Sequence, residues 1–270
     1  MNGINRINAV FQKVRKKKEG ALITYIMAGD PTIQATYEYV LAMEEAGADI
    51  MELGIPFSDP VADGPTIQRA GLRAIKSKTT PIKILNLVRK IRERSEVPIV
   101  FMTYYNIVHN IGEKEFVKKM KNAGADGLII PDMPVEESSI LSRACKEYDI
   151  SLILLVSPAS DNKRVAKIAE KTTGFLYIVS TFGVTGERRS ISDHTTKLVR
   201  RIKPLTRGVP LVVGFGISTP KHVSHVVKSG ANGAVVGSAI VKMIEKKKNI
   251  NSIKKFVKEL KDAAIATSNI

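Results

Sequence analysis

The sequence predicts an α/β protein in which parallel strands alternate with helices and close into an eight-stranded β/α barrel. Short apolar runs rich in β-branched residues recur about eight times with amphipathic segments between them, as crossover helices in a parallel sheet require. The length of 270 residues and the hydrophobic fraction of 44% suit one such domain with a full core. No linker rich in Pro, Gly or Ser divides the chain. We therefore expect a single (β/α)8 TIM barrel over residues 1–270, with an extra helix before the first strand and a further basic helix at the other end.

The strand candidates are short and mostly apolar on both faces. Such runs are typical of strands that pack against barrel side chains on the inside and against helices on the outside. They comprise residues 22–27, 50–53, 99–103, 127–130, 151–156, 175–179, 211–213 and 233–236.

The segments between the strands carry helical patterns. In one of them a single stripe is apolar while basic residues point elsewhere, and the stripe comprises Ile82, Leu85, Val88 and Ile91. A weak repeat, Ala-Gly-Ala-Asp at 46–49 and 123–126 and Ser-Gly-Ala-Asn at 229–232, closes three helices just before a strand. Its glycine is expected to end the helix, because the backbone at that position usually has a positive φ.

Charge and composition narrow the classes of protein. A net charge of +16 invites a nucleic-acid interpretation, since clustered Lys and Arg release counterions from phosphate backbones. The basic runs 15–18 and 246–248 lie near the chain ends, however, and the other basic residues are single charges on outer helix faces, so a solvated surface is favoured. The single cysteine, Cys145, is expected to be a small buried side chain rather than a nucleophile. We expect a cytoplasmic protein without a membrane span, because no apolar run approaches about 18 residues.

Acidic residues gather around the second predicted strand, where barrel enzymes carry catalytic groups. Glu52 lies within the strand and either points into the barrel mouth as a proton-transfer group of raised pKa or is a buried acid satisfied by backbone amides. Asp63, in the long loop that follows, is the second catalytic candidate, although it could also cap the next helix, which has Pro65 near its first turn. For Asp30, after the first strand, we favour the cap.

Glycines after the last two predicted strands suit a phosphate group. Residues 214–218 (Gly-Phe-Gly-Ile-Ser) follow the seventh strand, and Gly237-Ser238 opens a helix after the eighth. Barrels of this kind bind phosphate with the backbone amides of these loops and with a helix N-terminus. Plain tight turns are the alternative, and a dinucleotide fingerprint is weaker because its third glycine is missing.

The loop 180–189 is long, polar and glycine-bearing. It is predicted to be either a lid that adds Gly186 to the phosphate site or a variable surface loop. The residue Tyr177, in the strand before it, could face the barrel mouth. We expect no metal site, because no P-loop, G-x-S-x-G or zinc pattern appears and the histidines lack metal-ligand spacing. Surface positions are expected for His109, His194, His222 and His225.

The run 52–65, Glu-Leu-Gly-Ile-Pro-Phe-Ser-Asp-Pro-Val-Ala-Asp-Gly-Pro, closely resembles the signature of the tryptophan synthase alpha chain family. Further blocks resemble that family in its order and extend the resemblance over nearly the whole chain. They are Ala-Gly-Asp-Pro at 28–31, Tyr-Tyr-Asn at 104–106, Pro-Asp-Met-Pro at 131–134, Gly-Val-Thr-Gly at 183–186 and residues 214–218.

The resemblance implies the reversible retro-aldol cleavage of indole-3-glycerol phosphate to indole and glyceraldehyde 3-phosphate, with no cofactor or metal in this chain. Glu52 is then expected to protonate C3 of the indole and to take the proton of the glycerol hydroxyl. Asp63 is expected to stabilise the positive charge near the ring nitrogen and to accept its hydrogen bond. The other implied site residues are Tyr177 near the reacting centre, Tyr25 and Tyr104 in the indole pocket, and Gly186, Gly216, Gly237 and Ser238 at the phosphate.

The resemblance also implies a partner, a beta subunit that carries pyridoxal phosphate and consumes the indole within an α2β2 complex. The loops around Asp59 and over residues 181–188 are expected to meet it. Two positions depart from the family pattern: Thr181 stands where many members have arginine, and Met27 where threonine is expected. Both bear on lid closure and coupling rather than on the proposed acids.

Two other functions are weighed against this one. A barrel of the indole-3-glycerol phosphate synthase type shares the late phosphate loops, but it needs a catalytic lysine, and the apolar strands contain no isolated lysine. It also leaves the acid-rich loop unexplained. A basic nucleic-acid binder is motivated by charge alone, and filter binding across a range of salt concentrations tests it.

Overall fold

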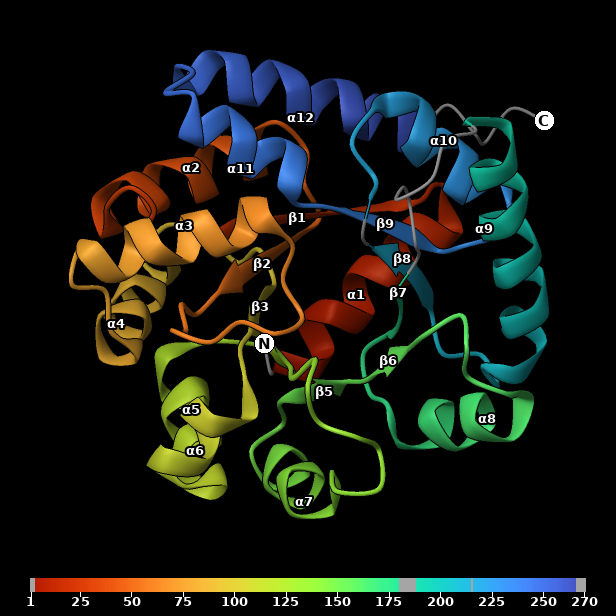
Figure 1. Cartoon of the computed structure of the whole chain (residues 1–270), viewed down its shortest axis with the longest axis horizontal. Coiled ribbons are helices and arrows are strands. Elements are labelled where there is room, and N and C mark those ends of the chain that lie inside the picture. The colour runs from red at the N-terminus through yellow and green to blue at the C-terminus, as the bar shows by residue number, and fades with distance from the viewer. Residues whose placement is uncertain (1–2, 180–187, 215, 266–270) are drawn as a thin grey trace.

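The structure, a computed structural model, describes residues 3–179, 188–214 and 216–265. Every strand in this part of the chain runs parallel to its neighbours in one sheet, in the order β5-β4-β3-β2-β1-β9-β8-β7-β6. Helices surround the strands in Figure 1. The predicted barrel is confirmed, and each predicted strand is present to within a residue or two of its ends. The strands are β1 Ala21–Met27, β2 Ile50–Gly54, β3 Ile99–Met102, β4 Gly127–Ile129, β5 Ser151–Ile153, β6 Leu155–Val156, β7 Leu176–Val179, β8 Leu211–Gly214 and β9 Gly233–Val236.

The fifth predicted strand is divided into β5 and β6, and the two pieces complete the ring. β5 pairs with β4, whereas β6 pairs with β7. The break falls at Leu154, whose N–H donates to the Thr172 hydroxyl at 2.8 Å instead of to a neighbouring strand. Its carbonyl still accepts from the Tyr177 N–H at 3.1 Å, so the barrel is continuous across the break.

The helices form an outer layer, with additional helices after β2, β3 and β9. They are α1 Gly3–Lys16, α2 Ile33–Glu45, α3 Pro65–Lys76, α4 Pro81–Arg92, α5 Tyr105–Ile111, α6 Glu113–Ala123, α7 Ser139–Glu147, α8 Asn162–Lys171, α9 Arg188–Ile202, α10 Pro220–Lys228, α11 Ser238–Glu245 and α12 Ile250–Ile265, with a short 3-10 helix at Lys203–Leu205. Within the described residues, none of these helices is long and apolar enough to cross a membrane.

Two apolar cores stabilise the barrel. The larger one lies between the strands and the surrounding helices, and the smaller one fills the barrel interior. Helix α1 closes the smaller core, because its side chains Ile7, Phe11 and Val14 are buried there. Figure 1 shows this helix crossing the ring of strands. The predicted N-terminal helix is therefore a plug of the barrel rather than an appendage.

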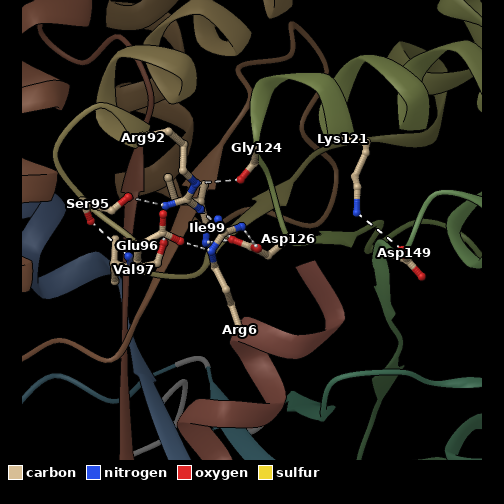
Figure 2. A network of polar contacts seen from close by, with 10 residues as sticks. All are labelled: Arg6, Arg92, Ser95, Glu96, Val97, Ile99, Lys121, Gly124, Asp126 and Asp149. Atoms are coloured by element: carbon tan, nitrogen blue, oxygen red, sulfur yellow. Dashed lines mark hydrogen bonds and ion pairs between the residues drawn. The ribbon is translucent and has the colours of Figure 1, made fainter. Parts of the chain in front are cut away.

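A charged network fixes α1 to the end of the barrel where the strands begin (Figure 2). The fully buried Asp126 accepts from Arg6 at 3.0 Å and from Arg92 at 2.7 Å. It also accepts from the N–H of Ile99, the first residue of β3, at 2.8 Å. Because this one carboxylate satisfies two cations and a strand end, it ties α1, α4 and β3 together at the end of the barrel where the strands begin.

In the internal repeat, both the glycine and the last residue have a structural role. Its glycines, Gly47, Gly124 and Gly230, all have positive φ, as predicted for helix ends. The last residue of each repeat accepts a hydrogen bond from the N–H of a residue at the start of the preceding strand. The pairs are Asp49 with Leu22 at 2.8 Å, Asp126 with Ile99 at 2.8 Å and Asn232 with Leu211 at 2.9 Å.

Two local predictions are wrong. Asp30 is not a helix cap, because Thr32 caps α2 by accepting from the Ala35 N–H, and the buried Asp30 instead pairs with Arg73 at 2.7 Å. Ile82 does not belong to the buried stripe of α4, since it lies in the first turn and is 66% exposed. The rest of that stripe is buried as predicted. Cys145 is buried, also as predicted, and burial raises the pKa of its thiol to about 12.

Candidate active site

Glu52 points into the barrel from the middle of β2. Its chain neighbours Met51 and Leu53 pack in the outer core, so strand alternation directs the Glu52 side chain to the inside. The residue is 1% exposed, and its Oε2 atom has no hydrogen-bond partner among the described residues. Burial, reinforced by the negative charge of Asp63, raises the pKa of Glu52 to about 8. The alternative prediction, an acid whose oxygens are hydrogen-bonded by backbone amides, therefore does not hold for Oε2 of Glu52.

Asp63 lies in the loop between β2 and α3, on the same side of the barrel. The alternative role as a helix cap is excluded, because Gly64 is the N-cap of α3 and no side chain caps that end. Burial raises the pKa of Asp63 to about 6, although a hydrogen bond from the Tyr104 hydroxyl opposes the shift. The two carboxyl groups thus differ at neutral pH: Glu52 retains its proton, whereas Asp63 is mostly ionised.

Tyr104, which lies beyond the end of β3 and is the N-cap of α5, holds the loop that carries Asp63. Its buried hydroxyl accepts from the Ala62 N–H at 3.0 Å and is hydrogen-bonded to the Asp63 carboxylate. The Tyr104 ring stacks on Phe57, from the start of the same loop, with ring centroids 5.3 Å apart. The Tyr104 hydroxyl therefore orients the Asp63 carboxylate.

One pocket unites most of the predicted site residues. It contains about 420 Å³ of space, including the part open to solvent, and both Glu52 and Asp63 border it. The predicted residues that also line it are Tyr25, Tyr177, Gly216, Gly237 and Ser238. Tyr104 instead lines a smaller hollow that adjoins this pocket. Gly186 and the other residues of 180–187 in the predicted loop 180–189 lie outside the described residues, and the last two residues of that loop instead begin α9.

Two glycines make room for the tyrosines that flank Glu52. A Cβ atom at Gly54 would collide with the Tyr25 hydroxyl, and one at Gly214 would collide with the Tyr177 hydroxyl. Burial, reinforced by the nearby acids, raises the pKa of both tyrosines well above its ordinary value. Both hydroxyl groups therefore stay neutral over the physiological range.

Another edge of the pocket is formed by backbone. Gly237 and Ser238 stand at the start of α11, and Gly216 has a positive φ of 75°. A Cβ atom at Gly237 would lie 3.1 Å from Tyr25, a tight contact that glycine avoids. None of the described residues that line the pocket is a lysine or an arginine. An anion bound here would interact with backbone N–H groups and with the positive end of the helix dipole.

Sequence reasoning missed the apolar walls of the pocket, which are Ile67, Met102, Ile217 and Val235. Two of these could have been found from strand alternation, because Met102 and Val235 face the barrel interior near the ends of their strands. Ile67 lies in α3, and nothing in the sequence of that helix indicated that this residue faces the pocket.

The described residues contain no group of three His, Cys, Asp or Glu side chains that could hold a metal ion. The prediction of surface histidines is confirmed for His109 and His194. The two histidines of α10, His222 and His225, are only partly exposed, and His225 is hydrogen-bonded to Thr196 at 2.9 Å.

Comparison with known proteins agrees with this geometry. A family model described as tryptophan synthase alpha chain matches residues 11–267. The tryptophan synthase alpha chain of Methanosarcina acetivorans is 46% identical over 99% of this chain and 97% of its own length, and that of Methanocaldococcus jannaschii is 46% identical over 90% and 86%.

Solved structures agree as well. The tryptophan synthase alpha subunit of Legionella pneumophila superposes with a TM-score of 0.87 at 33% identity, covering 100% of both chains. A chain from the tryptophan synthase α2β2 complex of Pyrococcus furiosus superposes with a TM-score of 0.85 at 41% identity, covering 90% of this chain and 98% of that one. The chain under study therefore belongs to the tryptophan synthase alpha chain family.

Proposed function

We propose that this chain catalyses the reversible cleavage of indole-3-glycerol phosphate to indole and glyceraldehyde 3-phosphate, as the alpha subunit of a tryptophan synthase. The observation that carries the proposal is a single pocket bordered by the buried Glu52, by the partly buried Asp63 with a different pKa, and by a glycine-lined helix start. All strands in the described part of the chain belong to one sheet, which supports one domain over residues 1–270 as the unit that carries the reaction.

Glu52 acts as the proton donor and then as the base. With a pKa of about 8 it holds a proton at neutral pH, and it delivers this proton to C3 of the indole ring. The bond between C3 and the glycerol carbon then breaks, and its electron pair returns to the ring. The hydroxyl on that glycerol carbon gives its proton to the Glu52 carboxylate as the aldehyde forms. The group is thereby restored to its protonated state.

Asp63 stabilises the charge that this step creates. Protonation at C3 leaves positive charge at the ring nitrogen, and an ionised carboxylate beside that nitrogen accepts its hydrogen bond. The pKa of about 6 keeps Asp63 ionised at neutral pH. Tyr104 supports this role, because its hydroxyl bonds to both the loop and the carboxylate.

The remaining site residues bind the substrate. Gly216, Gly237 and Ser238 take the phosphate through backbone N–H groups at the start of α11, and Gly186 joins them from the loop that precedes α9. Tyr25 and Tyr177 lie beside Glu52 and enclose the reacting carbon. The aromatic ring then extends toward Asp63 and Tyr104.

The chain needs no cofactor of its own for this chemistry, and pyridoxal phosphate belongs to the beta subunit. An α2β2 complex is known for the Pyrococcus furiosus relative. The loop after β2 is suited to meet such a partner, because Asp59 and the 82% exposed Val61 project from it. We place the complex in the cytoplasm, in keeping with the free thiol of Cys145.

Release of indole from indole-3-glycerol phosphate tests the proposal. Wild-type chain is expected to release it, Glu52→Gln and Asp63→Asn to lose about 10²-fold or more in rate, and the exposed Glu259→Gln to behave as wild type. Addition of a beta subunit is expected to accelerate release. Full activity in Glu52→Gln would refute the assignment of the proton donor. The rival barrel would be favoured if the chain consumed the substrate of indole-3-glycerol phosphate synthase and released no indole.

A further inference from the structure

A second hollow opens off the catalytic pocket. It contains about 320 Å³ of space, including the part open to solvent, between the end of β1, the loop after β2 and helix α3. Only about 10 Å³ of this accepts a water-sized sphere, so a ligand enters it only if a side chain moves. Four residues border both spaces: Tyr25, Asp63, Ile67 and Met102. Glu52, Tyr177 and the glycines at the start of α11 border only the catalytic pocket. The hollow therefore lies on the far side of Asp63 from the phosphate end.

Met27 forms one wall of this hollow. The residue ends β1, is 4% exposed and pairs in register with Gly54 of β2. Its terminal methyl group lies 3.2 Å from the position of a Cβ atom at Gly54 and 3.7 Å from that of one at Gly71. A methionine side chain has three rotatable bonds, so it fills irregular space and yields to a larger ligand.

Gly71 forms the facing wall, and its identity is not required by the backbone. It lies inside α3, where glycine is among the least favourable residues, and its φ is not positive. A Cβ atom there would meet only the Met27 methyl group within 4 Å, at an ordinary contact distance. Alanine would thus fit, and glycine instead leaves room between α3 and Met27.

We propose that Met27 and Gly71 determine which substituents on the benzene ring of the indole this enzyme accepts. The inference rests on the proposed function, in which the ring nitrogen lies at Asp63. Carbons 6 and 7 lie on the nitrogen side of the benzene ring, so a methyl group there enters the hollow. A methyl group at carbon 4, beside the reacting C3, stays in the catalytic pocket.

Condensation of glyceraldehyde 3-phosphate with 6-methylindole, 4-methylindole and indole tests this specificity. The quantity to measure is kcat/KM for each methylindole divided by kcat/KM for indole. Met27→Ala is expected to raise the ratio for 6-methylindole about 10-fold, and Gly71→Ala to lower it about 10-fold, because one methyl group in an apolar pocket discriminates by that factor or more. The ratio for 4-methylindole is expected to stay at the wild-type value in both variants.

Met120→Ala is the matched control, since it removes an equally buried methionine from α6, away from both spaces. It is expected to leave both ratios unchanged. Gly71→Ala keeps the test decisive if Met27→Ala does not fold, because alanine favours the helix. If wild type condenses indole, an unchanged 6-methylindole ratio in Gly71→Ala and in folded Met27→Ala would overturn the proposal. Failure of wild type to condense indole would instead overturn the proposed function.

Discussion

Replacement of Glu52 by glutamine is expected to make the protein more stable as the pH rises, relative to wild type. The ordinary pKa of this carboxyl is 4.5, and burial raises it to about 8 in the folded protein. Between those values the unfolded chain releases a proton that the folded chain retains, so wild type loses stability with rising pH. The loss amounts to about 1.4 kcal/mol per pH unit, because one pKa unit corresponds to that free energy. Glutamine has nearly the same shape and no proton to lose.

The difference in unfolding free energy between Glu52→Gln and wild type is therefore expected to grow by about 3 kcal/mol from about pH 5 to about pH 7.5. Urea unfolding at several pH values measures it. Any cost of placing an amide at the unpartnered Oε2 position does not vary with pH, so the slope is the informative quantity. The exposed Glu259→Gln on α12 serves as the control and is expected to follow wild type. A flat difference across this range would refute the raised pKa of Glu52.

The remaining expectations concern the second acid and the anchored N-terminal helix. The pH profile of kcat/KM should be bell-shaped, with an acid limb near 6 where Asp63 takes up a proton and an alkaline limb near 8 where Glu52 loses one. In Tyr104→Phe the acid limb should move to higher pH, because the hydrogen bond that lowers the pKa of Asp63 is lost. An acid limb that does not move would contradict this role of Tyr104. Tyr105→Phe is the control, since the Tyr105 hydroxyl bonds to Glu113 instead. Asp126→Ala should lower the unfolding free energy by about 3–5 kcal/mol, because the largely buried Arg6 and Arg92 lose the buried carboxylate between them. A loss below about 1 kcal/mol in urea unfolding would show that their remaining partners, Glu96 for Arg6 and backbone carbonyls for Arg92, suffice.

Much of the fold follows from local pattern. The strands are short and mostly apolar on both faces, as expected for strands that are buried between a barrel interior and a layer of helices. The break at Leu154 could not be foreseen, because it depends on a hydroxyl from Thr172, which is far along the chain. The role of α1 as a plug was also hidden. Its apolar stripe indicates a buried face but not whether that face meets the outside of the sheet or its open end.

The candidate site was predictable where strand alternation or a loop motif carried the signal. Glu52 is an acid in an apolar strand, and such a residue needs a functional or hydrogen-bonded explanation. Asp30 misled the prediction, because an acid ahead of a helix looks like a cap whether or not an arginine such as Arg73 reaches it from another helix. The support of Asp63 by Tyr104 is likewise a contact across distant segments, which sequence spacing does not reveal.

The protonation state of Glu52 tests the proposed mechanism most directly. Infrared spectra of wild type and Glu52→Gln at neutral pH report the carbonyl stretch of a protonated carboxylic acid. We expect wild type to show one such band that Glu52→Gln lacks, and we expect the band to fade as the pH rises through about 8. In Asp63→Asn the band is expected to fade at a lower pH, because the negative charge of Asp63 helps to raise the pKa of Glu52. Identical spectra for wild type and Glu52→Gln at neutral pH would mean that Glu52 is already ionised, and it could not then be the proton donor.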